Sequence, residues 1–108
     1  IVDVNELQTR LIMRNLKNTE RVMDNAAVRE IIRIESEKGD QETIDDIRHL
    51  VTGAKGKLVL QEGKMDEAAW SCGMVVGLIN DIPSCDELVS RIMAEAEGIV
   101  RQRLAGFL

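Results

Sequence analysis

The chain of 108 residues is long enough for one domain with a single hydrophobic core. Its 44% hydrophobic and 31% charged residues are typical of a folded globular chain and argue against a disordered one. A net charge of -5, with one Trp, one Phe and no Tyr, argues against the basic, aromatic-bearing surfaces that bind nucleic acids. No apolar run reaches the roughly 18 residues of a membrane-spanning helix. We therefore expect neither nucleic acid nor a membrane as a partner.

The start of the chain and its cysteines indicate its origin and compartment. The sequence begins at Ile1 without an initiator Met or a signal peptide, so we expect that it was processed or taken from a longer protein. Cys72 and Cys85 form no CxxC pattern and have no histidine nearby, which fits neither a zinc site nor a redox motif. We expect two free thiols in a reducing compartment, the cytoplasm.

The first third of the chain predicts one short strand and one helix. The N-terminal residues have no clear hydrophobic period, and a strand over residues 11–13 is the one regular element that they suggest. Apolar residues from Val22 to Ile32 then recur at helical spacing, and we expect this helix to start at residues 18–20 and to end at Gly39. Arg33 lies three residues after Glu30 and four before Glu37, which predicts ion pairs on an exposed helix face.

Two short helices are expected next. Thr43 and Asp46 have the spacing of a capping box, and a helix with Ile44 and Ile47 on its buried side would follow and end at a left-handed Gly53. A third helix is expected over residues 55–61, with Gly63 as its end.

The last third of the chain predicts two helices. Asp66 would cap a helix over residues 67–79, in which Ala69, Gly73 and Gly77 share one face without large side chains. A neighbouring helix or a flat ligand fits such a face. After Pro83, a capping box at residues 84–87 opens the last helix. The sequence therefore predicts a mainly α chain of about five helices with at most one short strand.

The residues show no self-contained active site. Residues 52–58 resemble a phosphate-binding P-loop, but Val51 stands where glycine is required, and Leu58 stands where Ser or Thr would bind magnesium. The start of that helix is thus either a weak anion site or a plain helix cap. His49 is the only histidine, and we expect it to be structural because no catalytic set can be completed around it.

Three runs carry a resemblance to the nitronate monooxygenase (2-nitropropane dioxygenase) family. Residues 70–83 are similar to its C-terminal signature W-S-A-G-(M/Q)-x-x-G-L-I-x-D-x-P, residues 11–22 to its L-I-M-R-x-L-R-N-T-x-R-V segment, and residues 50–57 to its L-V-x-G-x-x-G-(R/K) segment. The order and spacing of the runs also agree, and residues 97–106 fit, so the resemblance covers nearly the whole chain.

The resemblance implies a longer TIM-barrel (α/β) oxidoreductase that holds FMN, with residues 1–108 as its C-terminal helical lid. The barrel loops that bind the flavin phosphate, and a catalytic histidine proposed for some members, would lie upstream, and His49 does not match that histidine. We therefore expect the isolated chain to be inactive and to bind FMN negligibly. Its apolar helix faces would pack on the missing barrel or on another copy in a homo-oligomer.

The resemblance also places four residues at the flavin and substrate pocket. Ser71 matches a serine that lines this pocket, and its hydroxyl is expected to donate to a nitronate or quinone oxygen. Trp70, Gly73 and Met74 flank it, and Gly73 would let backbone approach the isoalloxazine ring. Cys72 replaces the usual alanine.

Three functions follow as alternatives. Oxidation of alkyl nitronates, such as that of 2-nitropropane, is the reaction of the family's name. Met74, however, is shared with members that reduce quinones with NADH, and this reaction also stays open. The third interpretation is a stand-alone helical interaction module without catalysis.

Overall fold

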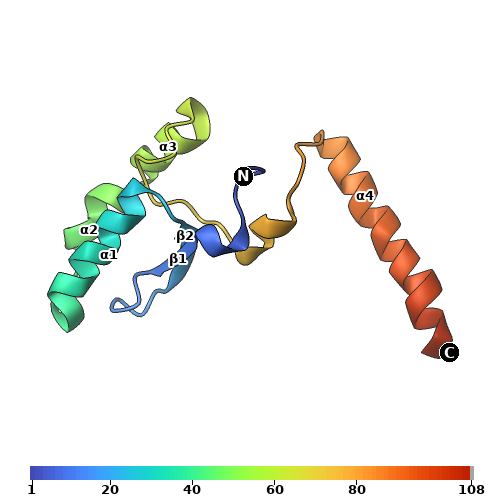
Figure 1. Ribbon diagram of the computed structural model, residues 1–108, viewed down its shortest axis with the longest axis horizontal. Helices are drawn as coiled ribbons and strands as arrows, with labels where there is room; N and C mark the ends of the chain where they lie inside the picture. Colours follow the sequence, from blue (N-terminus) through green and yellow to red (C-terminus); the bar gives the residue numbers. More distant parts are fainter. Residues whose placement is uncertain (108) are drawn as a thin grey trace.

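The computed structural model describes residues 1–107, which form a two-stranded sheet and four α-helices (Figure 1). In chain order the elements are β1 (Thr9–Ile12), β2 (Glu20–Met23), α1 (Ala26–Lys38), α2 (Ile44–Val51), α3 (Gly53–Glu62) and α4 (Cys85–Gly98). Short helical turns lie at Glu6–Gln8, Gly39–Gln41 and Met74–Leu78, and further turns follow α4. Within the described residues, no helix is long and apolar enough to cross a membrane.

The strands β1 and β2 form an antiparallel hairpin in which Thr9 faces Met23 and Ile12 faces Glu20. The strand predicted at residues 11–13 is therefore confirmed over most of its length. The helix start predicted at residues 18–20 is wrong, because these residues lead into β2. The apolar residues Val22 and Met23 fit the helical spacing by coincidence, and both are buried in the sheet instead.

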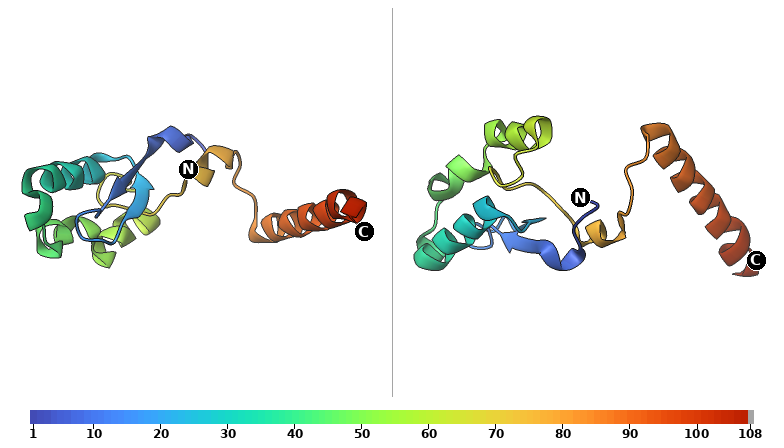
Figure 2. Two further views of the ribbon diagram at one scale, coloured as in Figure 1. Left: turned by 90° about the horizontal axis from the view of Figure 1, so that it is seen from below. Right: turned by 45° about the horizontal axis from the view of Figure 1, so that its top comes forward.

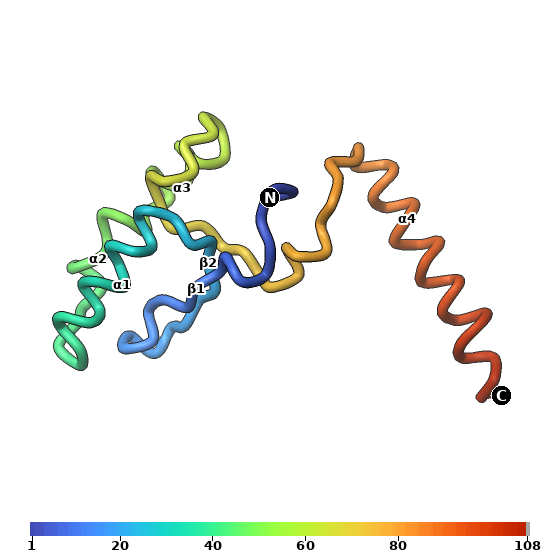
Figure 3. The backbone as a smooth tube through the Cα atoms, viewed as in Figure 1, coloured from blue at the N-terminus to red at the C-terminus, as the bar shows by residue number. Residues whose placement is uncertain are grey.

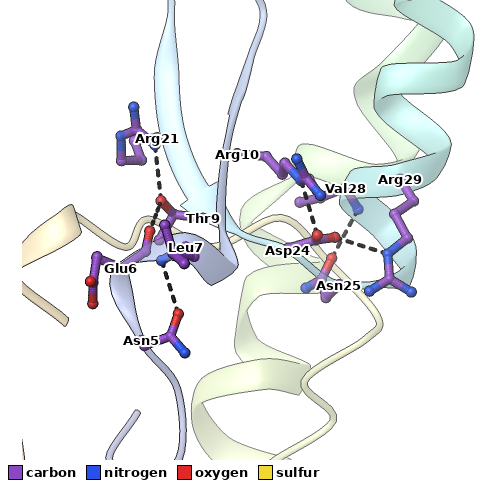
Figure 4. Close-up of polar contacts among 10 residues, drawn as sticks. All are labelled: Asn5, Glu6, Leu7, Thr9, Arg10, Arg21, Asp24, Asn25, Val28 and Arg29. Atoms are coloured by element: carbon purple, nitrogen blue, oxygen red, sulfur yellow. Dashed lines mark hydrogen bonds and ion pairs between the residues drawn. The ribbon is translucent and has the colours of Figure 1, made fainter. Parts of the chain in front are cut away.

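The helix α1 begins after Asn25, whose carboxamide oxygen accepts a hydrogen bond from the Val28 amide at 2.9 Å (Figure 4). The Asp66 carboxylate accepts from the Ala26 amide at 3.0 Å, so Asp66 caps α1 and not the helix predicted after it. Before the cap, Asp24 pairs with Arg10 at 2.9 Å and with Arg29 at 2.8 Å (Figure 4). These contacts tie the start of α1 to the hairpin.

One hydrophobic core lies between the hairpin, α1 and α2, and it contains Ile12, Met13, Val22, Val28, Ile31 and Ile47. The predicted end of α1 is confirmed, since Gly39 has a φ of 55°. The ion pairs predicted for Arg33 are also confirmed, at 2.7 Å to Glu30 and 2.5 Å to Glu37.

The helix α2 has its predicted capping box, with the Thr43 amide donating to the Asp46 carboxylate at 2.9 Å. The prediction that Gly53 ends this helix is wrong, because Thr52 is extended and caps α3, which starts at Gly53. The end of α3 at Gly63 is confirmed, with a left-handed φ of 67°.

The helix predicted over residues 67–79 is absent, and with it the bare face of Ala69, Gly73 and Gly77. The segment bends at residues 67–68, and Ser71 then pairs with the edge of β2 before the turn Met74–Leu78. Two glycines would each cost this helix about 1 kcal/mol relative to alanine, while the exposed edge of β2 offers hydrogen bonds to an extended chain. A second small core of Met23, Cys72 and Val76 fixes the arrangement.

The helix α4 stands apart from the rest of the chain (Figures 1, 2 and 3). Its predicted capping box is confirmed, with the Glu87 amide donating to the Ser84 hydroxyl at 3.2 Å. None of its residues is buried. The radius of gyration is accordingly 18.3 Å, against about 13 Å for a compact chain of this length. The expectation that apolar helix faces are not fully buried within this chain is confirmed for α4.

Candidate functional site

Residues 70–72 run along β2 as a short additional edge of the sheet. The Met23 amide donates to the Trp70 carbonyl at 3.2 Å, and the Cys72 amide donates to the Arg21 carbonyl at 3.1 Å. Ser71 lies opposite Val22 in this antiparallel pairing. The pairing fixes the position of the Ser71 side chain relative to β2.

The Ser71 hydroxyl donates a hydrogen bond to the Glu20 carboxylate. Glu20 lies two residues before Val22 on β2, so the two side chains are on the same face of the sheet. Ser71 is paired with Val22, and its side chain is therefore on this face too. The one hydroxyl proton of Ser71 is committed to this contact, and its oxygen lone pairs remain available. In this arrangement the Ser71 oxygen can accept hydrogen bonds, whereas the sequence suggests a donor.

A cleft of about 420 Å³ opens beside this pair, between residues 69–71 and the start of α3. Its lining consists of Glu20, Val51, Thr52, Gly53, Gly56, Leu60, Ala69, Trp70 and Ser71. A Cβ atom added at Gly53 or Gly56 would meet nothing within 4 Å, so this wall is open backbone. The Thr52 hydroxyl accepts from the Lys55 amide at 3.5 Å and is occupied as a helix cap.

Trp70 also lines the cleft and is partly buried. Its indole N–H donates to the Met65 carbonyl at 3.3 Å. The polar end of the ring is therefore directed at the chain, and the remaining ring surface contributes an apolar part of the cleft lining.

The structure brings together two of the four residues named from the sequence. Trp70 and Ser71 line the cleft, whereas Gly73 and Met74 lie beyond it at the start of the turn Met74–Leu78, where Met74 is 55% exposed. Gly77, which the predicted helix placed near them, packs instead on residues Glu6–Gln8, since a Cβ there would collide with the Glu6 carboxylate.

The other candidate groups of the sequence lie apart from the cleft. His49 is exposed on α2. Both cysteines are free as predicted, Cys85 exposed and Cys72 buried, and burial raises the pKa of the Cys72 thiol. Among residues 1–107, no group of three His, Cys, Asp or Glu side chains is placed to hold a metal ion.

Glu20 is the cleft residue that the sequence did not single out. It was assigned to a helix start, where an acidic residue needs no further explanation. The run Glu20–Met23 has two charged residues followed by two apolar ones, which is not the alternation of a half-buried strand, so no local signal marks Glu20.

Comparison with known proteins identifies a fold but no family. No protein-family model matches the sequence. The chain is similar to a structure of FabK from Thermotoga maritima, with 20% identity and a TM-score of 0.76 over 99% of this chain and 32% of that chain. A point mutant of the same protein matches with 17% identity and a TM-score of 0.67, over 99% of this chain and 29% of that one.

Residues 1–107 thus have the fold of one part of FabK. The chain spans about a third of the length of the FabK chains that it matches. Its mainly helical character is as predicted, with four α-helices and a small sheet in residues 1–107 instead of five helices.

Proposed function

We propose that residues 1–108 are the C-terminal part of an FMN-dependent oxidoreductase, and that the cleft at Ser71 faces the flavin and the substrate. The observation that carries the proposal is the meeting of residues 50–57 and 70–71 in one cleft. These are parts of two of the three runs that resemble nitronate monooxygenases. The similarity in fold to part of FabK supports an oxidoreductase of this general kind.

The cleft residues fit the ring of a flavin but not its phosphate. Val51, Leu60 and Ala69 give apolar surface, and the bare backbone at Gly53 and Gly56 permits close approach of a flat ring. No basic side chain lines the cleft, and a flavin phosphate needs cations or a cradle of amides. The proposal therefore assigns the phosphate to a preceding barrel domain of a longer chain.

In the proposed reaction, bound FMN would supply the electron acceptor for the oxidation of an alkyl nitronate. The residues of this chain would orient the flavin ring: the Ser71 lone pairs would accept from a ring N–H, and Trp70 would provide apolar surface. Gly73 and Met74 would contact the substrate only at the rim, because they lie outside the cleft lining.

Reduction of a quinone with NADH is the second candidate reaction. It is favoured by one observation, the Glu20 carboxylate next to Ser71, because a carboxylate disfavours an anionic nitronate more than an uncharged quinone.

The partner of α4 is part of the same proposal. Its exposed side chains Leu88, Val89, Ile92 and Met93 would pack on the barrel domain or on a second copy of the chain. We place the complete protein in the cytoplasm, where both thiols would stay reduced.

The complete protein tests this proposal. It should show the absorbance of bound flavin as purified, and it should turn over either an alkyl nitronate with oxygen or a quinone with NADH. The 108-residue chain should bind FMN negligibly in a fluorescence titration. Tight, saturable binding of FMN by the 108 residues, or a complete protein without flavin, would overturn it.

A further inference from the structure

We propose that Glu20 sets the ligand selectivity of the cleft: through its charge and its contact with Ser71, it favours an uncharged ring that donates an N–H or O–H group and disfavours an anion. This inference rests on the proposed function in assuming that the cleft takes a ligand. It adds the chemical class of that ligand and the residue that selects it.

The hydrogen bond between Ser71 and Glu20 leaves these two side chains with acceptor oxygens and no free proton. The Ser71 proton is given to Glu20 and the Trp70 N–H is given to the Met65 carbonyl, whereas Thr52 accepts from the Lys55 amide and keeps its own hydroxyl proton. Carboxylate and hydroxyl oxygens remain to receive hydrogen bonds. A ligand that itself brings a donor is complementary to these two oxygens.

The charge at this position is not neutralised by neighbouring residues. Glu20 is the only ionisable side chain among the residues lining the cleft. Arg21, the next residue on β2, points to the opposite face and donates to the Thr9 hydroxyl at 2.9 Å (Figure 4). Lys55, at the start of α3, pairs with Glu67 at 3.0 Å. A ligand in the cleft therefore meets one net negative charge.

Trp70 provides a readout that does not depend on turnover. It is the only tryptophan of the chain and it lines the cleft, so its fluorescence reports occupancy directly. We would titrate the 108-residue chain with uracil, an uncharged cyclic imide, and with propane-2-nitronate, an anion, at matched ionic strength. Uracil should change the Trp70 emission saturably. The nitronate should bind at least about fivefold more weakly than uracil.

Three variants separate charge from hydrogen bonding. Glu20→Gln keeps the size of the side chain and removes the charge, and it should reduce the preference for uracil by about fivefold. Ser71→Ala keeps the charge, and it should weaken uracil binding while the nitronate remains disfavoured. Glu97→Gln removes the same charge from α4, far from the cleft, and should leave the preference unchanged.

The wild-type chain gives an independent measurement in case a variant fails to fold. Added salt should narrow the gap between the two ligands, because the charge of an open cleft is screened. The inference is overturned if uracil causes no saturable change, if salt leaves the ratio unchanged, or if a folded Glu20→Gln chain keeps the wild-type ratio. A flavin-free complete protein with the expected ratios would instead overturn the proposed function alone.

Discussion

The two halves of the molecule, residues 9–62 and the segment of α4, both have apolar helix faces, but only the first buries them within the chain. Residues 9–62 bury Val28, Ile31 and Ile47 between the hairpin, α1 and α2. The helix α4 has a comparable set of apolar residues, yet Ile92 and Met93 are each 56% exposed. Amphipathic spacing therefore indicates that a helix has a face to bury, but it does not indicate whether the partner belongs to the same chain.

The largest effect that distinguishes the halves should come from truncating a core isoleucine. Ile31→Ala removes a fully buried side chain, and it should lower the free energy of unfolding by about 2–5 kcal/mol. Ile92→Ala is the matched control on α4, where the same truncation should change stability by less than about 0.5 kcal/mol. Urea unfolding followed by circular dichroism measures both. Equal losses would mean that α4 packs on the rest of the chain in solution.

Helix caps in the two halves provide a second comparison. Asn25 caps α1 and also donates to the Met65 carbonyl at 2.7 Å and the Ala68 carbonyl at 2.9 Å. Asn25→Ala should therefore lower the free energy of unfolding by about 1–3 kcal/mol, since it leaves buried groups unpaired.

Ser84→Ala is the corresponding change on α4. It removes an exposed cap and should reduce only the helicity of the first turn of α4, without moving the main unfolding transition. Hydrogen exchange of the amides resolves the two regions. A global loss of protection in Ser84→Ala would contradict this separation.

Local signals in the sequence predicted four ends of elements correctly, although they failed at Gly53 and at Asp66. The capping boxes at Thr43 and Ser84, and the turns at Gly39 and Gly63, are found as predicted. Each depends on contacts within a few residues, so the amino-acid order is sufficient to specify it.

Other predictions are wrong where a segment forms hydrogen bonds with residues that are distant in the sequence. The edge of β2 holds residues 70–72 in an extended conformation, and Asn25 and Asp66 join segments some 40 residues apart. A helical period in residues 67–79 carries no information about such partners. For the candidate site the consequence was direct: Trp70 and Ser71 were named from the sequence, but Glu20 was not, since it joins Ser71 only through the sheet.

A substitution at Ser71 tests whether the cleft in the packed half takes part in catalysis. In the complete enzyme, Ser71→Ala should reduce kcat/KM by the equivalent of about 1 kcal/mol, and up to about 3 if a buried partner is left unpaired, while flavin stays bound. The stability of the 108-residue chain should change little, because Ser71 is exposed. Loss of flavin from the variant would show that Ser71 holds the cofactor.

The smallest expected effect concerns two acidic residues that occupy the same capping position in the two halves. Hydrogen bonds from Lys38 and then from Thr43 lower the pKa of Asp46 from 3.8 to about 2. In α4, hydrogen bonds from the Ser84 amide and hydroxyl lower the pKa of Glu87. A carboxyl group with a lowered pKa in the folded state stabilises that state above its ordinary pKa, and the contribution is lost as the pH falls through the folded value.

For Asp46 this contribution is lost between about pH 4 and about pH 2. Protonation of Asp46 also breaks its 2.5 Å ion pair with Lys38, which joins α1 to α2. Acidification should therefore lower the main unfolding midpoint, and Asp46→Asn should remove part of that pH dependence. Glu87→Gln should leave it unchanged, because the cap of α4 is coupled to no core. Thermal unfolding between pH 5 and pH 2 measures both variants against the wild type. If Glu87→Gln alters the main transition as much as Asp46→Asn does, α4 is not an independent arm but part of the same cooperative unit.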